Sequence, residues 1–386
     1  MLVFFLHGVA TRDVKYGDKL KGFITEEFTK RGEFLPHFYY SFWGDVLNDV
    51  GRMWNWIHQD LQELKKESPN LDIQTILRYQ QFRQGFLSEF VGDAFTYLNQ
   101  ERGVKIRELI ADQLEDFIRR NPEETDLHIV AHSLGSVILW DSLFSDRFDS
   151  DDAAFHIRSM IKGLGDSTSK IQVCLRSITT MGSPILFFNT MLDINPNKVK
   201  SFAKSYKNQW LRWINIIHSS DIIAYPIRTS FNIDSSDNIF LQDEYILNHA
   251  NLAENTAYTV GQVDAALALG VVDAHHWYMN CSKTANLITN NILAGKNIMY
   301  DVISRLKKIP EVKNVLTPLN YIFDKKLVHL KFRDGSGSIQ MYVNFANIHH
   351  VYIFNDNENC KFAGYFGWNY ANNFQEEIEL IKKEFC

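Results

Sequence analysis

The sequence predicts an α/β protein built around a parallel sheet, and three stretches carry that prediction. Residues 2–6 form a continuous apolar run, as expected of a strand that is buried on both faces of a sheet. Residues 18–30 then place apolar side chains at helical spacing, and residues 38–42 indicate a second strand. Residues 127–144 pass from an apolar strand through a serine into an apolar helix. This order of elements is typical of parallel sheets whose strands are joined through helices.

The composition is that of a globular protein with room for more than one folded unit. The chain has 386 residues, enough for one large domain of roughly 250–300 residues with a smaller one, or for two ordinary domains. Hydrophobic residues make up 45% and charged residues 22%, far from the composition of disordered chains. The net charge of -6 argues against a nucleic-acid partner, because binding phosphates requires a cationic surface.

Cysteine spacing and the first residues indicate the compartment. The four cysteines have no CxxC spacing, so neither a zinc site nor a disulfide framework is expected. The opening MLVFFLHG lacks a basic region and a small-residue cleavage site, which favours a strand over a signal peptide. No apolar run approaches the ~18 residues of a membrane-spanning helix. We therefore expect a cytoplasmic protein without a transmembrane segment, for which peripheral membrane contact is possible.

A long helical region precedes the serine. Residues 47–100 exceed what a simple connection between strands needs, so we interpret them as a helical insertion and a candidate lid over an active site. Its aromatic side chains, Trp54 and Trp56, are more typical of core than of a lipid-facing surface. The helix that follows carries an apolar stripe from Ile106 to Ile118 and should end just before Pro122.

The segments after the serine helix alternate in type. We expect a loop with one or two helical turns over residues 150–169, and two further strands over residues 171–180 and 210–218. Residues 232–248 should be irregular, and residues 256–269 should form short strands or a helix. A helix capped by Gly295 is expected over residues 283–294.

The composition changes after residue 297. Residues 325–332 and 339–345 flank an Asp-Gly-Ser-Gly turn signal, and residues 350–354 and 361–366 suggest a second hairpin. A helix over residues 373–384 is expected to follow. We therefore divide the chain into an α/β domain of residues 1–297 and a small α+β accessory unit of residues 298–386, which is a candidate for oligomerisation or partner binding.

Ser133 is the candidate nucleophile. In Ala131-His132-Ser133-Leu134-Gly135 the residues two before and two after the serine are small, as a sharp strand-to-helix turn requires. The pattern is GxSxG with alanine in the first glycine position, which predicts a nucleophile elbow that lifts Oγ clear of the sheet. The alternative is an ordinary strand-turn-helix with a solvated serine.

A serine nucleophile needs a base and a carboxylate that orients the base. Asp221 directly follows an apolar strand, where the ligand-contacting loops of parallel sheets lie. Two adjacent histidines, His275 and His276, come later in what we expect to be a loop, and position alone does not choose between them. The alternative for Asp221 is a turn-capping aspartate. A metal role for the histidines is not expected, because adjacent histidines point apart and no further ligand is suitably spaced.

These motifs resemble those of the α/β-hydrolase superfamily, in particular its lipase-like and esterase-like serine hydrolases. The matching segments are FFLHG, VAHSLGS, TMGSP, NIIHSSDIIAYP and AHHWY, and the resemblance covers roughly residues 1–297. It implies a mostly parallel sheet of about six strands, a triad of Ser133, Asp221 and His275, and no cofactor. In one bacterial subset a histidine is followed three residues later by an aromatic residue. That pattern matches His275 with Tyr278 and favours His275 over His276.

The resemblance also implies the remainder of the site. The backbone N–H groups of Val9 and Leu134 would form the oxyanion hole, and His7, Gly8 and His132 are candidates for lining the substrate pocket.

The expected activity is hydrolysis of a carboxylic ester, an acyl lipid or a similar apolar ester, through an acyl-enzyme. A thioesterase, an acyltransferase or a peptidase with the same triad remains an alternative. So does a non-catalytic binding module on a hydrolase fold, with the C-terminal unit docking a partner.

Overall fold

The structure is a computed structural model. It describes residues 1–9, 11–46, 50–77, 80, 83–84, 88–165, 169, 171–205, 211–232 and 239–293, and the backbone of the strands within residues 312–369. The statements below concern these residues.

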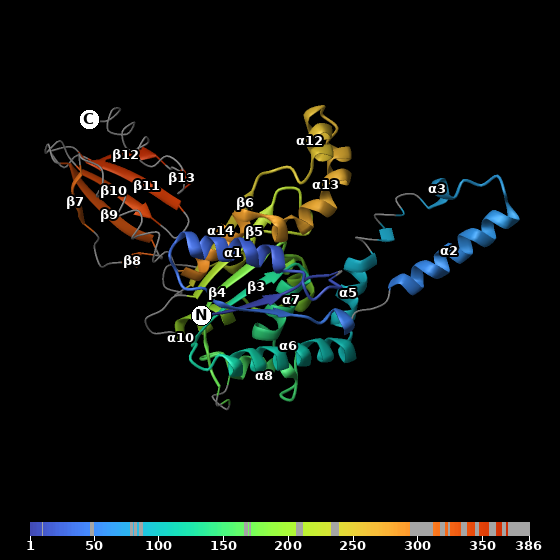
Figure 1. The fold of residues 1–386 in the computed structure, drawn as a ribbon, viewed down its shortest axis with the longest axis horizontal. Helices are drawn as coiled ribbons and strands as arrows, with labels where there is room; N and C mark the ends of the chain where they lie inside the picture. Colours follow the sequence, from blue (N-terminus) through green and yellow to red (C-terminus); the bar gives the residue numbers. More distant parts are fainter. Residues whose placement is uncertain are drawn as a thin grey trace.

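A six-stranded sheet forms the centre of the α/β part, and all its neighbouring strands run parallel (Figure 1). The prediction of an α/β fold on a parallel sheet is confirmed. The strand order is β2-β1-β3-β4-β5-β6. Strand β2 therefore lies on one side of β1, and β3 to β6 follow one another on its other side. The strands are β1 Leu2–Leu6, β2 His37–Ser41, β3 Asp126–His132, β4 Cys174–Met181, β5 Leu211–His218 and β6 Ile239–Ile246.

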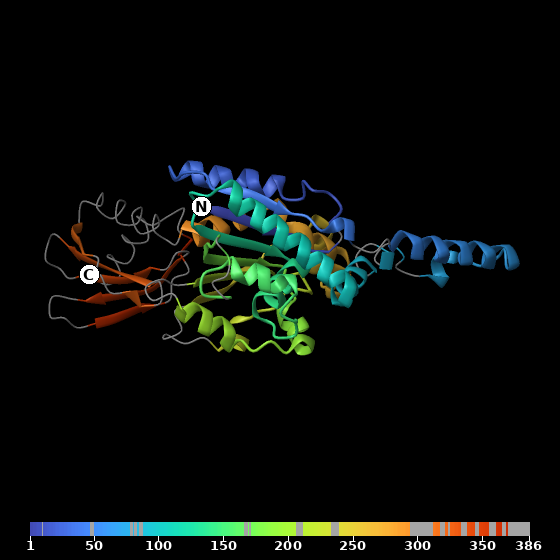
Figure 2. The same ribbon diagram turned by 90° about the horizontal axis from the view of Figure 1, so that it is seen from below.

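Helices cover both faces of this sheet. Figures 1 and 2 show α1 (Asp18–Lys30) and α14 (Ser282–Leu293) together on one side, with α6 (Gln100–Arg120) and α8 (Ala153–Ser159) on the other. Helix α7 (Leu134–Phe144) is buried along its whole length, which explains its uniformly apolar sequence. The remaining helices of the domain are α9 Ile185–Leu192, α10 Asn197–Ser205, α11 Arg228–Phe231, α12 Leu252–Thr259 and α13 Val263–Trp277, with short 3-10 turns η1 Gly44–Val46 and η3 Tyr278–Asn280.

The expectation of irregular structure over residues 232–248 was wrong, because the sixth strand, β6, lies there. Its sequence IFLQDEYI breaks the apolar run with three polar residues. An edge strand tolerates this, since β6 pairs only with β5 and its middle residues are half-buried. The ambiguous stretch that follows is helical and forms α12 and α13.

The helical insertion contains α2 (Val50–Glu67), α3 (Ile73–Ile76) and α5 (Ser88–Leu98). Figures 1 and 2 show α2 and α3 extending away from the sheet. Trp54 is buried and its indole N–H donates to Ser88 Oγ over 3.1 Å, whereas Trp56 is 59% exposed. The expectation of core packing is therefore confirmed for Trp54 and wrong for Trp56.

The C-terminal region contains a second sheet of seven strands. Both expected hairpins are confirmed as antiparallel pairs, β9 with β10 and β11 with β12. The expected helix over residues 373–384 and the capping Gly295 lie outside the described residues. The strands are β7 Val312–Leu316, β8 Tyr321–Ile322, β9 Lys325–Phe332, β10 Ser338–Val343, β11 Asn347–Phe354, β12 Cys360–Gly364 and β13 Trp368–Asn369.

Two further findings concern the described residues. None of their helices combines the length and the apolar character that a membrane span requires. The thiols of Cys174 and Cys281 are free.

Candidate active site

Ser133 occupies a strained turn between the end of β3 and the start of α7. Its backbone has φ 51° and ψ -129°, although left-handed φ values are disfavoured for residues with a side chain. The Ser133 N–H donates to the carbonyl of Met181 at the end of β4, over 3.0 Å. This bond ties the turn to the neighbouring strand and helps to hold the strained conformation, a sharp strand-to-helix turn of the kind that a nucleophile elbow requires.

Two glycines allow the elbow to lie directly against the end of β1. A Cβ atom built on Gly135 would lie 2.4 Å from the carbonyl oxygen of His7, and one on Gly8 would lie 2.4 Å from Ser133 Cβ. Real Cβ contacts are not this short, so any side chain at either position would push the two segments apart. Glycine is therefore needed on both segments of this contact, at position 135 in the serine turn and at position 8 after β1.

The structure brings Ser133, His275 and Asp221 together. His275 Nε2 lies 2.8 Å from Ser133 Oγ. On the other side of the ring, His275 Nδ1 lies 3.1 Å from Oδ1 and 3.0 Å from Oδ2 of Asp221. Serine, imidazole and carboxylate thus form a continuous hydrogen-bonded chain at the carboxyl-terminal edge of the sheet, although the outer two residues are far apart in sequence.

The protonation pattern follows from the carboxylate. Burial alone would raise the pKa of Asp221, but the charge of His275 and hydrogen bonds from His275, Ile223 N–H and Tyr278 lower that pKa below its usual value. Because an ionised carboxylate only accepts, His275 Nδ1 carries the proton and donates it to Asp221. In the neutral ring, Nε2 of His275 then accepts from the Ser133 hydroxyl, which is the arrangement that a general base requires.

The expectation that His275 lies in a loop was wrong, because it occupies the last turn of α13. Adjacent helical residues point about 100° apart, so only one of the two histidines can face the serine. His275 is 1% exposed, whereas His276 is exposed and its Nδ1–H donates to the carbonyl of Val272. The tertiary structure thus places His275, the histidine that the resemblance favours, against Ser133 and leaves His276 at the surface.

His7 is fully buried, and both its ring nitrogens are used within the protein. Nδ1 donates to the carbonyl of Gly8 over 2.7 Å, and Nε2 accepts from the backbone N–H of Trp43 over 3.1 Å. The ring also stacks on the Trp43 indole with centroids 4.3 Å apart. Burial lowers the pKa of His7 to about 3, so the ring is neutral at ordinary pH. Its contacts fix the turn that contains Gly8.

His132 is likewise buried, beside the candidate nucleophile. Its Nε2–H donates to the backbone carbonyl of His275 over 2.8 Å. Burial lowers the pKa of His132 well below its ordinary value, so the ring stays neutral and keeps this donor. The side chain therefore holds the segment that carries His275.

The two proposed oxyanion donors occupy the segments that meet at the serine. Leu134 is the first residue of α7, and the first N–H groups of a helix have no partner within the helix. Val9 follows Gly8 in the turn that contacts Ser133. Both residues are buried.

Sequence reasoning missed several residues that support the site. Tyr278 served only as a marker for choosing a histidine, yet its hydroxyl contacts Asp221. Ser136 donates its hydroxyl to the Ser133 carbonyl over 2.6 Å and lies 2.7 Å from Ser183 Oγ. A signal was available for Ser183, because it follows Gly182 directly after strand β4, at the same edge of the sheet as the elbow.

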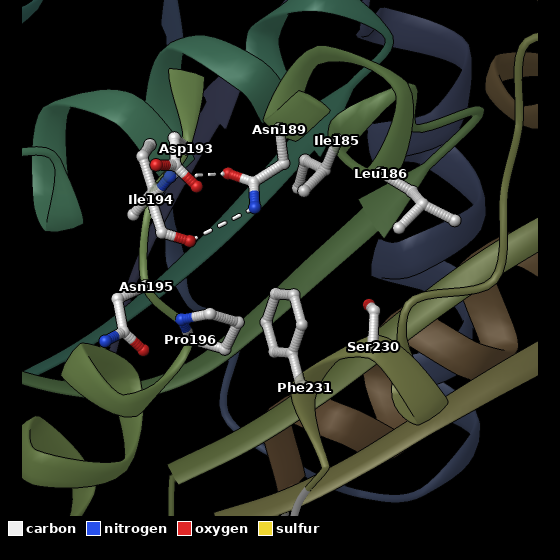
Figure 3. A pocket seen from close by; sticks show the side chains of 9 residues that line it. All are labelled: Ile185, Leu186, Asn189, Asp193, Ile194, Asn195, Pro196, Ser230 and Phe231. Atoms are coloured by element: carbon white, nitrogen blue, oxygen red, sulfur yellow. Dashed lines mark hydrogen bonds between the residues drawn. The ribbon is translucent and has the colours of Figure 1, made fainter. Parts of the chain in front are cut away.

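A cavity of about 420 Å³ lies between α9, α11 and the turn over residues 193–196 (Figure 3). Figure 3 shows Ile185, Leu186 and Phe231 lining it together with polar side chains, among which Asn189 donates to the Ile194 carbonyl over 3.1 Å. Ser133, Asp221 and His275 do not line this cavity.

Among the described residues, no group of three or more His, Cys, Asp or Glu side chains is arranged to hold a metal ion. No protein-family model matches the chain, and no curated protein is significantly similar to it.

Proposed function

We propose that this protein is a serine hydrolase that cleaves carboxylic esters through an acyl-enzyme. The observation that carries the proposal is the hydrogen-bonded chain from Ser133 Oγ through His275 to Asp221, with 2.8 Å between Oγ and Nε2. Solvated serines do not acquire such partners, and the strained φ of 51° is consistent with a backbone held for function.

The reaction assigns one role to each group. As Ser133 Oγ attacks the ester carbonyl carbon, its proton moves to His275 Nε2, and the carbonyl oxygen becomes an oxyanion that the N–H groups of Val9 and Leu134 would bind. Asp221 orients the imidazole and stabilises its charged form. His275 then gives the proton to the leaving alcohol as the carbon–oxygen bond breaks. Water, activated by the same imidazole, releases the acid and restores the serine.

Exposed apolar side chains on the two segments that carry Asp221 and His275 support an apolar ester as the substrate, either an acyl lipid or a similar molecule. Ile222, the residue after Asp221, is 47% exposed, and Tyr225 in the same turn is 38% exposed. On the helix that carries His275, Leu269 is 50% exposed and Val272 is 37% exposed. Exposed apolar side chains on the segments that carry the reacting groups are compatible with an apolar ligand.

The decisive experiment is intact-mass measurement of the full chain after treatment with a fluorophosphonate probe, with and without detergent micelles. Micelles are included because Ser133 is fully buried. We expect one probe adduct on the wild-type protein and none on Ser133→Ala. Ser142→Ala is the matched control, since Ser142 is another buried serine of α7 and should leave labelling intact. Folded wild-type protein that stays unlabelled under both conditions would refute the proposal and favour a binding module.

Turnover then tests the substrate class. Ester substrates from acetyl to dodecanoyl should be hydrolysed with a preference for the longer chains, and Ser133→Ala should lose on the order of 10⁶ in turnover. Matched thioester and amide substrates should be poorer. A preference for either of them over the esters would replace the ester assignment with a thioesterase or a peptidase.

A further inference from the structure

We propose that Tyr278 is a positioning residue. Its hydroxyl holds the Asp221 carboxylate in place and weakens the attraction of that carboxylate for the imidazole proton of His275. The inference rests on the proposed function, because it concerns how the same triad is tuned. The proposed proton transfers do not use Tyr278, which lies three residues after the base in η3.

The Tyr278 hydroxyl is fixed from two sides. It donates to Asp221 Oδ2 over 2.8 Å and accepts from the backbone N–H of His218 over 2.8 Å. His218 is the last residue of β5, and Asp221 lies in the turn that follows. One phenol therefore connects the end of the strand to the carboxylate that the strand presents, and the side chain of Tyr278 is fully buried.

Both oxygens of Asp221 are engaged, and among the described residues Tyr278 is the only side chain besides His275 that is hydrogen-bonded to them. Oδ1 accepts from the Ile223 N–H over 3.1 Å, and Oδ2 accepts from Tyr278. His275 Nδ1–H lies between the two oxygens, at 3.1 and 3.0 Å. Without the phenol, Oδ2 would have only the imidazole, so the carboxylate could rotate and would attract the imidazole proton more strongly.

Tyr278 keeps its proton under all working conditions. Burial raises the pKa of Tyr278 far above its ordinary value, and the charge of Asp221 adds to this effect. The hydroxyl is thus a permanent donor to Asp221, and its influence on the carboxylate does not change with pH.

Close packing leaves the tyrosine ring little room. A Cβ atom on Gly182 would lie 2.9 Å from Tyr278 Cε2 and 3.1 Å from Asp221 Oδ2. The His132 ring packs against Tyr278 with centroids 5.8 Å apart, while His132 Nε2–H holds the His275 carbonyl. The phenol is therefore held between the end of β3, which carries His132, and the end of β5, which precedes Asp221.

Other titratable groups surround the triad, and they matter for any pH profile. They are His132 from β3, His218 from β5, His276 from α13, and Glu254 and His249, whose charges act on His218. Burial lowers the pKa of both His132 and His218, so neither gains a proton near neutral pH. An acid limb of activity near neutral pH is therefore not expected to arise from His132 or His218.

The test compares kcat and kcat/KM over a range of pH for the full-length wild-type protein and Tyr278→Phe. The variant keeps the ring and removes only the hydroxyl. We expect kcat to fall about tenfold with KM nearly unchanged, because the phenol touches the carboxylate and not the substrate. The acid limb of kcat/KM should move to higher pH by roughly 0.5 unit, since a carboxylate that has lost a donor stabilises the imidazolium more strongly.

Tyr97→Phe is the matched control. Tyr97 is also buried and also donates to a buried carboxylate, Asp141 Oδ2, over 2.5 Å, but it belongs to α5. Its removal should lower the midpoint of thermal unfolding and leave the acid limb in place. A Tyr278→Phe protein that loses stability but keeps both kcat and the wild-type acid limb would show that Tyr278 is merely structural.

Two measurements keep the inference separate from the proposed function. The proton NMR resonance of His275 Nδ1–H needs no substrate, and its titration should move to higher pH in Tyr278→Phe; an unmoved titration refutes the inference. Replacing Tyr278 by a fluorotyrosine strengthens the donor, keeps the shape and should move the titration to lower pH. This second variant decides the matter if Tyr278→Phe fails to fold. Failure of the proposed function would instead appear as absent probe labelling in the wild-type protein.

Discussion

The backbone of Gly8 lies against the side chain of Ser133: a Cβ atom at position 8 would be 2.4 Å from Ser133 Cβ and 3.1 Å from its Oγ. The turn after the first strand and the serine turn after the third strand are therefore in van der Waals contact. A change in one segment is therefore expected to displace the other, because close-packed interiors have few empty spaces that could absorb a displacement.

Replacement of Gly8 by alanine should therefore displace the serine. We expect Gly8→Ala to lose on the order of 10² in kcat/KM toward esters, the cost of a displacement of about 1 Å at a reacting group. Gly22→Ala is the control, because a Cβ there meets nothing within 4 Å and alanine favours the helix. It should keep full activity. A Gly8→Ala protein as active as Gly22→Ala would show that the contact does not position the nucleophile.

Gly182 should matter for the carboxylate in the same way. Its φ is 58°, and an added Cβ would contact Tyr278, Asp221 and His132 at 2.9, 3.1 and 3.3 Å. Gly261 has φ 80° and open space, so alanine there pays only the backbone cost of about 1–2 kcal/mol. We expect both variants to lose stability in urea unfolding and only Gly182→Ala to lose kcat. Equal activity of the two would contradict this reading.

Helix α7 carries a buried carboxylate whose ion-pair partner, Arg147, is 35% exposed. The Asp141 carboxylate is fully buried, and Arg147 donates to both its oxygens from Nε at 2.9 and 3.1 Å. Arg147→Met would leave that charge inside the protein, with Tyr97 as the remaining side-chain donor among the residues that the structure describes. The free energy of unfolding should fall by about 3 kcal/mol.

The control for this variant is Arg120→Met. Arg120 pairs with Asp116 on the surface, with side-chain exposures of 71% and 42%. Exposed pairs of this kind contribute about 0–1 kcal/mol. Urea unfolding of both variants checks the comparison, and equal losses would mean that water reaches Asp141.

Glu244 on β6 should make stability depend on pH. Burial is the main cause that raises the pKa of Glu244 from 4.5 to about 7. The native state then holds a proton that the unfolded chain has lost, so the free energy of unfolding falls as pH rises through this interval. Glu244→Gln should remove this part of the slope when urea unfolding is measured between about pH 4.5 and about pH 8. Glu123→Gln, at an exposed carboxylate, should keep the wild-type slope. A Glu244→Gln protein with the wild-type slope would refute the assignment.

Much of the fold could be predicted from local sequence alone. The apolar run of β1 and the strand-serine-helix order around Ser133 are determined by which side chains avoid water, and this reads directly from periodicity. The same holds for the two C-terminal hairpins, whose turn signals lie between β-prone segments. Strand β6 was not predicted because its own sequence interrupts the apolar run with polar residues. It forms a strand because it pairs with β5.

Local patterns of residues are enough to place a serine on a sharp turn, an acidic residue after a later strand, and two histidines after that residue. The spacing to Tyr278 favoured His275 over His276, but the contact of His275 with Ser133 depends on which side of α13 packs against the sheet, and that is a matter of tertiary packing. The tertiary structure also decided that Asp221 receives the phenol of Tyr278. Contacts between residues so distant in sequence arise from the packing of whole elements, and no local pattern of residues encodes them.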